Sequence, residues 1–259
     1  MQIHCVQLNI AWEDKPANHA KVRALLNRIK PQPDSLILLP EMFSTGFSMN
    51  VPNVADDHTR ADYTFLSTLA RDLRTYVLAG LVTTSPDGQG RNQSVAFNPQ
   101  GLEIGRYTKL HSFTPGKEAA HYQQGEQIVT FDWLAMKTCP FICYDLRFPE
   151  IFRAAARQRP HLFALIANWP SMREDHWVTL CRARAIENQA YVAAVNRCGN
   201  DPWLPYPGRS LIIDPHGVIL ADAGRDETVI TANLDPSAVD SWRRDFPILA
   251  DMRMNFVKP

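Results

Sequence analysis

The chain has 259 residues, and its 27 lysines and arginines are balanced by 27 aspartates and glutamates, so the formal net charge is zero. A balanced charge excludes the broad electrostatic attraction on which nucleic-acid and anionic-membrane binders rely, although one small basic pocket for an anionic substrate stays compatible with it. With 45% hydrophobic and 21% charged residues, the composition is typical of globular proteins, which at this length need no disulfide or metal to complete the core.

The start of the chain and its cysteines predict a cytoplasmic protein. Residues 1–14 become polar at once and lack the basic start and apolar run of a signal peptide. Apolar runs such as Leu36–Leu39 are much shorter than the roughly 18 residues of a membrane-spanning helix. The cysteines are odd in number and irregularly spaced, which favours free thiols in a reducing compartment: Cys5, Cys139, Cys143, Cys181 and Cys198.

The first half of the chain alternates predicted strands with predicted helices. Apolar residues recur at helical spacing in Val22–Ile29 and again in Leu66–Leu73. A loop with little periodicity, Leu110–Gly125, ends this half. The predicted strands are Gln2–Asn9, Ser35–Leu39, Tyr76–Thr83, Asn92–Asn98 and Leu102–Tyr107.

The second half continues the alternation and ends in a short helix. Helices are predicted over Pro149–Gln158, where the proline suits the first turn, and over Arg173–Asn188. No internal repeat or linker-like stretch interrupts the chain, so we expect a single domain, residues 1–259, with mixed α/β layers. The predicted strands are Gln127–Phe131, Leu134–Cys143, Leu162–Asn168, Tyr191–Asn196, Ser210–Ile213, Val218–Ala221 and Thr228–Leu234.

Cys143 is a candidate nucleophile because it ends an apolar strand and precedes a predicted helix. At such a turn a side chain is held out of the packed sheet, and backbone N–H groups beyond it can bind an oxyanion. A free thiol with a pKa near 8.5 is only a few per cent ionised at neutral pH, so it needs a base or a cation nearby. The alternative is a buried strand cysteine, which is the commoner fate of free cysteine.

Three further ionisable residues are candidates by position. Glu41 follows the buried strand Ser35–Leu39, where a poorly solvated carboxylate suits proton transfer. Lys109 also follows a strand and is either an oxyanion-stabilising cation or a solvated surface lysine. Glu118 lies in the aperiodic loop and, taken alone, is expected to be solvent-exposed.

In chain order, Leu-Pro-Glu-Met-Phe around Glu41, Tyr-Thr-Lys-Leu-His around Lys109 and Cys-Tyr-Asp-Leu-Arg-Phe-Pro-Glu from Cys143 resemble the nitrilase, or carbon–nitrogen hydrolase, superfamily. The resemblance covers about Gln2 to Leu234. Within the superfamily it is strongest to ω-amidases acting on 2-oxo acid amides. It implies a four-layer αββα sandwich, no cofactor, and a homodimer or higher homo-oligomer, in which the tail Phe246–Pro259 is a candidate contact segment.

The resemblance also implies roles for these residues. Cys143 is expected to form a thioester, while Glu41 either takes its proton or shares it as a thiolate–acid pair. Lys109 and the backbone N–H of Tyr144 are expected to stabilise the oxyanion. Glu118, which matches the second glutamate of the superfamily, is expected to bind Lys109 or the attacking water.

An ω-amidase also has to bind the carboxylate of its substrate. Arginine suits this task because its planar guanidinium pairs with a carboxylate through two hydrogen bonds. The candidates are Arg147 and Arg173, although Arg147 has the alternative of a structural salt bridge with Asp145 or Glu150. Expected apolar walls of the pocket are Phe43, Phe113 and Trp169.

Other functions are less consistent with the sequence. Cys139 and Cys143 form a lone C-x₃-C without partners at zinc spacing, so no metal site is expected. Rival activities within the superfamily are hydrolysis of aliphatic amides, N-carbamoyl amino acids or nitriles. A catalytically silent scaffold is a further alternative, but such a protein has no need of Glu41, Lys109, Cys143 and Glu118 together.

Overall fold

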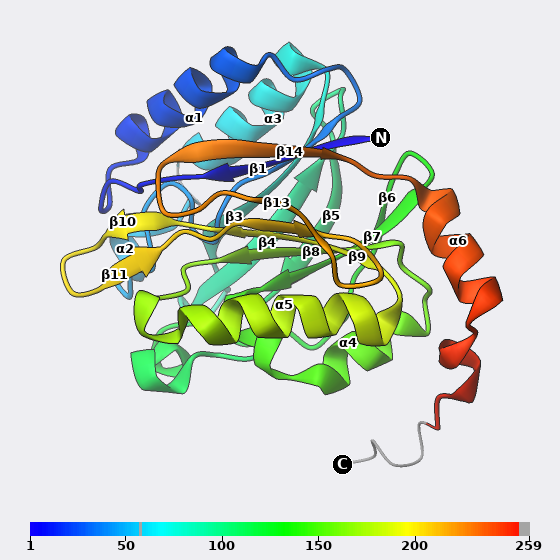
Figure 1. Ribbon diagram of the computed structural model, residues 1–259. Helices are drawn as coiled ribbons and strands as arrows, with labels where there is room; N and C mark the ends of the chain where they lie inside the picture. The colour runs from blue at the N-terminus through cyan, green and yellow to red at the C-terminus, as the bar shows by residue number, and fades with distance from the viewer. Residues whose placement is uncertain (57–58, 254–259) are drawn as a thin grey trace.

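The computed structural model describes residues 1–56 and 59–253, and two six-stranded sheets form its centre (Figure 1). The first sheet has the strand order β14 (Thr228–Asn233), β1 (Gln2–Gln7), β2 (Leu36–Leu38), β3 (Tyr76–Thr84), β4 (Gly90–Phe97) and β5 (Glu103–Thr108). The second has the order β13 (Ile219–Asp222), β12 (Leu211–Ile213), β9 (Tyr191–Asn196), β8 (Leu162–Ala167), β7 (Met136–Ile142) and β6 (Phe131–Trp133). A separate pair consists of β10 (Cys198–Asn200) and β11 (Pro205–Pro207).

Helices cover the outer faces of both sheets, which confirms the predicted αββα sandwich (Figure 1). The first sheet is covered by α1 (Lys15–Ile29) and α3 (Ala61–Leu73), and the second by α4 (Pro149–Ala156) and α5 (Glu174–Asn188). Two further helices are α2 (Val51–Val54) and α6 (Pro236–Asp245), and the 3₁₀ turns are η1 (Thr114–Gly116), η2 (Glu118–Ala120), η3 (Cys143–Arg147), η4 (Ser171–Arg173) and η5 (Ile248–Asp251).

Strand β2 shows how the layers are held together. Its side chains alternate, because successive residues of a strand point to opposite faces of the sheet. Leu36 and Leu38 belong to the hydrophobic cluster between the two sheets, and Ile37 packs in the cluster under α1 and α3. The predicted run of apolar residues is therefore a strand buried on both faces, as is usual for parallel strands covered by helices.

Strand direction brings the candidate residues to one edge. Strands β1, β2 and β3 are parallel, and so are β7, β8 and β9. Strand β5 runs in the same direction as β3, because each is antiparallel to β4. Since ligands of such sheets bind beyond the carboxyl ends of the strands, the residues that follow β2, β5, β7 and β8 define the place for a site.

The structure also differs from the sequence-based expectations in several loops. The strand expected over Leu134–Cys143 starts at Met136, because Leu134 has a positive φ of 52° and forms the turn of the β6–β7 hairpin. Of the strand expected over Gln127–Phe131, only Phe131 is in a strand. The short pair β10–β11 has no counterpart among the predicted elements. Part of the expected contact tail, residues 254–259, lies outside the described residues.

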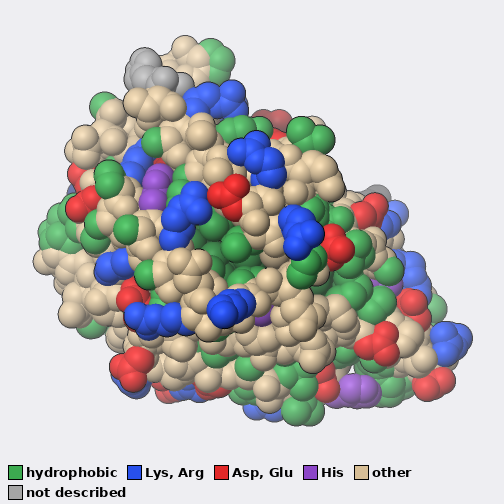
Figure 2. Space-filling model, turned by 90° about the horizontal axis from the view of Figure 1, so that it is seen from above, with side chains coloured by type: hydrophobic (Ala, Val, Ile, Leu, Met, Phe, Trp, Pro, Cys, Tyr) green, Lys and Arg blue, Asp and Glu red, His purple; other side chains and the backbone are tan. Residues whose placement is uncertain are grey.

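Two further observations concern membranes and charge. Within residues 1–56 and 59–253, no helix is both long and apolar enough to cross a lipid bilayer. Acidic and basic side chains are interspersed over the face seen from above in Figure 2. This mixture agrees with the balanced net charge of the sequence.

Candidate active site

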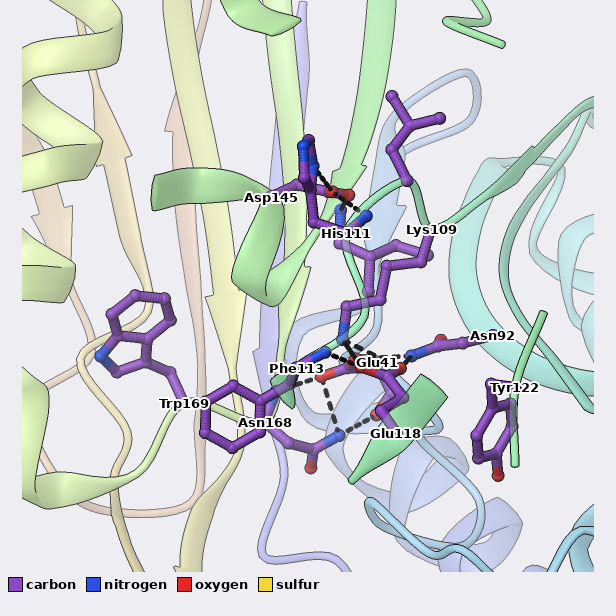
Figure 3. A network of polar contacts seen from close by, with 12 residues as sticks. Glu41, Asn92, Lys109, His111, Phe113, Glu118, Tyr122, Asp145, Asn168 and Trp169 are labelled. Atoms are coloured by element: carbon purple, nitrogen blue, oxygen red, sulfur yellow. Dashed lines mark hydrogen bonds and ion pairs between the residues drawn. The ribbon is translucent and has the colours of Figure 1, made fainter. Parts of the chain in front are cut away.

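The four candidate residues meet at the carboxyl edge of the sheets. Glu41 follows β2, Lys109 follows β5, and Cys143 begins η3 directly after β7. Glu118 begins η2 in the loop between β5 and β6, and its side chain is buried, contrary to the exposure expected from its position alone. Figure 3 shows Glu41, Lys109 and Glu118 pointing toward one another.

Lys109 is the shared partner of both glutamates. Its Nζ lies 2.9 Å from Oε1 of Glu41 and 2.9 Å from Oε2 of Glu118. Burial lowers the pKa of Lys109, but the negative charges of Glu118 and Glu41 outweigh it and raise the pKa above its ordinary value. Lys109 is therefore a permanent cation, and Glu118 binds it as the resemblance implied.

Two asparagines complete the environment of Glu41, and sequence reasoning gave neither a role. Asn92 Nδ2 donates to Oε1 of Glu41 at 2.7 Å and to Oε1 of Glu118 at 2.9 Å. The backbone N–H of Asn168, directly after β8, donates to Oε2 of Glu41 at 2.8 Å. The sequence offered one signal for Asn92, because it is a polar residue near the start of a buried strand, β4.

Cys143 is almost completely buried and has a positive φ of 46°. Positive φ is uncommon outside glycine, and it turns the chain sharply out of β7 into η3. Burial raises the pKa of the Cys143 thiol well above its ordinary value; the charge of Glu41 raises it further, while Lys109 opposes them. The net shift favours the thiol form of Cys143, which needs a base to become a nucleophile.

A small pocket gives access to Cys143 and Lys109. Phe113 and Trp169 line it, as expected for two apolar walls, and Tyr144, the residue after the nucleophile, lines it as well. The remaining wall residues were not predicted: Phe47, Asn168, Pro170, Leu204 and Tyr206. A wider cavity of about 690 Å³ adjoins it and shares Phe47, Phe113 and Arg173, so the pocket opens through an apolar vestibule.

Both candidate arginines line the pocket. The guanidinium of Arg147 lies 4.7 Å from the ring centroid of Trp169. The guanidinium of Arg173 lies 5.4 Å from the ring centroid of Phe113. Burial lowers the pKa of Arg147, and the charge of Arg173 lowers it further. Among the described residues neither arginine has a carboxylate partner, so the alternative of a structural salt bridge from Arg147 is wrong.

Phe43, in contrast, is not a wall of the pocket. Its ring is buried under the helices, with centroids 5.7 Å from His19 and 5.9 Å from Phe65. Met42 has a positive φ of 44° within a turn over residues 41–45, and Phe43 packs in the hydrophobic cluster under α1 and α3. Phe47 occupies the place expected for it, with its ring centroid 5.2 Å from Nζ of Lys109.

Comparison with known proteins agrees with this geometry. The profile of the carbon–nitrogen hydrolase family matches residues 2–244. The chain belongs to this family. It is 32% identical to a 2-oxoglutaramate amidase of Bacillus subtilis, with 97% of each chain covered. It is 37% identical to the omega-amidase YafV of Yersinia enterocolitica, covering 97% of this chain and 96% of that one.

Solved structures of family members share the fold. A carbon–nitrogen hydrolase superfamily protein of Xanthomonas campestris superposes with a TM-score of 0.90 at 32% identity, covering 98% of this chain and 97% of that one. Nit3 of Saccharomyces cerevisiae, a nitrilase superfamily member, gives 0.87 at 30% identity, covering 96% and 94%. The protein is therefore an amidohydrolase of the nitrilase superfamily.

Proposed function

We propose that this carbon–nitrogen hydrolase is an ω-amidase, which hydrolyses the terminal amide of 2-oxoglutaramate or 2-oxosuccinamate to a 2-oxo dicarboxylate and ammonia. The observation that carries the proposal is the pair Arg147 and Arg173, which lines the pocket of Cys143 without any carboxylate partner among the described residues. Two guanidiniums that lack a carboxylate partner fit a substrate that carries a carboxylate beyond its amide. Relatives named 2-oxoglutaramate amidase and omega-amidase support the same substrate class.

In the first half-reaction, Glu41 accepts the proton of the Cys143 thiol while the sulfur bonds to the amide carbon. The carbonyl electron pair moves to oxygen, and the tetrahedral oxyanion forms. Its collapse breaks the C–N bond, and the proton on Glu41 passes to the leaving nitrogen as ammonia departs. A thioester on Cys143 remains.

In the second half-reaction, Glu41 accepts a proton from water while the water oxygen attacks the thioester carbon. Collapse of this second intermediate breaks the C–S bond, and Glu41 returns its proton to the sulfur. The products are the carboxylic acid and the original thiol. Glu118 exchanges no proton in this scheme, because its role is to hold Lys109 through their 2.9 Å ion pair.

Lys109 and the backbone N–H of Tyr144 stabilise the oxyanion in both halves. Such a donor contributes about 3–4 kcal/mol to the transition state when it is fixed in advance in a water-excluded site. Lys109 is fixed by Glu41 and Glu118 before any substrate arrives. The site therefore needs little reorganisation during the reaction.

The proposal is tested by ammonia release from five substrates: 2-oxoglutaramate, 2-oxosuccinamate, propionamide, an N-carbamoyl amino acid and a nitrile. We expect kcat/KM for the two 2-oxo amides to exceed that for propionamide and for the nitrile by at least about 100-fold, because those two carry no carboxylate to pair with the arginines. The N-carbamoyl acid carries a carboxylate but no 2-oxo group, so we expect it to be hydrolysed more slowly than the 2-oxo amides. A preference for propionamide, the N-carbamoyl acid or the nitrile would assign one of the rival activities. No ammonia from any of them would favour a scaffold.

We also propose that residues 1–259 fold as one domain and that the protein is a cytoplasmic homodimer or higher homo-oligomer. Several apolar side chains are exposed on the surface of α5, the β12–β13 hairpin and the segment after α6, and they are available for such a contact: Ile186, Val218, Leu220 and Phe246. Light scattering coupled to size exclusion measures the mass directly. A mass of one chain at micromolar concentration would contradict the dimer.

A further inference from the structure

Asp145 is a buried carboxylate that the reaction scheme does not use. Its Oδ1 accepts hydrogen bonds from the backbone N–H of His111 at 3.0 Å and from Nδ1 of the same residue at 2.9 Å. Its Oδ2 accepts from the hydroxyl of Tyr107 at 2.7 Å and from the backbone N–H of Ile142 at 3.0 Å. Among the described residues it forms no ion pair with a lysine or an arginine, so these donors are the groups that hold its side chain in place.

The donors come from two chain segments that carry the reacting groups. Tyr107 and His111 flank Lys109 by two residues on either side, and the backbone N–H of Leu110 donates back to the Tyr107 hydroxyl at 3.3 Å. Ile142 is the residue before Cys143. Asp145 therefore binds both ends of the lysine segment and the residue before the nucleophile with one side chain. Figure 3 shows its contact with His111.

We propose that Asp145 and His111 act as positioning residues, which hold the Cys143 turn and the Lys109 segment in one fixed register. The inference rests on the proposed roles of Cys143 and Lys109. The two segments come from different sheets, and the sharp turn at Cys143 has the uncommon positive φ of 46°. A displacement of about 1 Å between reacting groups is enough to slow an enzyme by about 100-fold.

His111 contributes in two separable ways. Its Nδ1 donates to Asp145, and its ring stacks on Phe148 with a centroid distance of 3.8 Å and an interplanar angle of 9°. The variant His111→Asn keeps a donor near the position of Nδ1 but loses the stacking. The variant His111→Phe keeps an aromatic ring on Phe148 but loses the donor, so the pair separates positioning from packing.

The experiment measures kcat and KM for ammonia release, the rate of Cys143 alkylation by iodoacetamide, and Tm. We expect His111→Phe to lower kcat by about 10- to 100-fold and to slow alkylation, with KM changed less than about threefold. His111→Asn should recover most of the lost kcat even where its Tm is lower. His216→Phe, at an exposed histidine outside the site, is the control and should match the wild type.

A second variant, Asp145→Asn, places an NH₂ group against N–H or O–H donors in either orientation of the amide. It should lower kcat further than His111→Phe, at a KM near that of the wild type. The inference is overturned if His111→Phe keeps the wild-type kcat and alkylation rate, or if His111→Asn is as impaired as His111→Phe. Failure of the proposed function is distinguished because the wild type itself would then release no ammonia from the 2-oxo amides.

Discussion

Lys109 is a single cation that holds two buried carboxylates. Burying charges is unfavourable unless they are paired and their remaining acceptor sites are filled. The donors from Asn92 and the backbone of Asn168 fill these sites on Glu41. Glu41 is therefore held in place through both carboxylate oxygens, and its charge adds to burial in raising the pKa of the Cys143 thiol.

At the residue scale, the arginine pair makes a prediction about substrate affinity. Arg173→Met removes a guanidinium from the pocket but keeps much of the apolar stem against Phe113. We expect KM for 2-oxoglutaramate to rise by about 10- to 100-fold, since a charge-assisted pair is worth about 1.5–3 kcal/mol, with a smaller change in kcat. Steady-state ammonia release measures both constants.

Two controls sharpen this test. Arg23→Met changes an exposed arginine that pairs with Asp72 on the helical face, and it should leave both constants unchanged. Turnover of propionamide by Arg173→Met should match the wild type, because that substrate has no carboxylate. An equal loss on both substrates would mean that Arg173 supports the pocket itself rather than binding the anion.

Individual residues differ in how far the sequence predicts them. Glu41, Lys109 and Cys143 each follow a recognisable strand, so their place at the sheet edge is predictable from chain order and strand direction. Glu118 is not predictable in this way, because its burial depends on Lys109, which lies outside its own aperiodic loop. The prediction for Phe43 was wrong because the chain turns over residues 41–45, with a positive φ at Met42, and the Phe43 ring packs in the core under α1 and α3.

At the element scale, the close approach of β3 to the segment after β2 positions Glu41. A Cβ atom on Gly80 would lie 2.5 Å from the backbone nitrogen of Met42 and 2.6 Å from Cα of Glu41. Backbone atoms cannot give way as side chains do, so Gly80→Ala should push Glu41 out of place. We expect a loss of about 1–3 kcal/mol in the free energy of unfolding and a fall in kcat of about 100-fold.

The matched control is Gly105→Ala in β5 of the same sheet. Its added Cβ would lie 3.2 Å from the Cβ of Phe131, a contact that a shift of a few tenths of an ångström relieves. Chemical denaturation and ammonia release should show a milder change in stability and an almost normal kcat. A Gly80→Ala variant with normal kcat would contradict the positioning of Glu41 by β3.

The elements that the sequence predicts well are those with a strong internal period. The helices α1 and α3 show apolar residues at helical spacing, and β2 and β8 are continuous apolar runs. The pair β10–β11 has only three residues in each strand and no alternating pattern, so nothing in its own sequence reveals it. Contacts between distant segments also determine which strands share a sheet. No local pattern in the sequence reveals these pairings.

At the scale of the whole molecule, the first and last strands of the fold pair along the edge of one sheet. Residues Gln2–Gln7 of β1 lie against Thr228–Asn233 of β14. His4 is buried in this ladder, where Nδ1 lies 2.8 Å from Oγ1 of Thr231 and Nε2 has no partner. Burial lowers the pKa of His4 from 6.5 to about 4.

This shift gives a pH dependence of stability. Between about pH 6.5 and pH 4 the unfolded chain binds a proton at His4 that the folded protein does not, so acidification favours unfolding. The contribution of neutral His4 to the free energy of unfolding is fully present above pH 6.5 and is lost as the pH falls toward 4. We expect His4→Asn, which does not titrate, to flatten the slope of the free energy of unfolding across this window.

Denaturation curves at several pH values measure that slope, and His216→Asn at an exposed position serves as the control. A slope in His4→Asn equal to that of the wild type and the control would show that other groups dominate acid unfolding. The slope of each variant is compared with the slope of the wild type, because every buried carboxylate also contributes to the wild-type curve.

The site itself is a product of the whole fold, since Glu41 and Lys109 come from one sheet and Cys143 and Asn168 from the other. The reaction proposed for this site depends on a thioester that forms on Cys143. The most direct measurement is intact and peptide mass spectrometry of enzyme quenched during turnover of 2-oxoglutaramate, with Cys143→Ala alongside. We expect an acyl group, equal in mass to substrate minus ammonia, on the peptide that contains Cys143, and no adduct or turnover in Cys143→Ala. Substantial turnover by that variant, or an adduct on another residue, would contradict it.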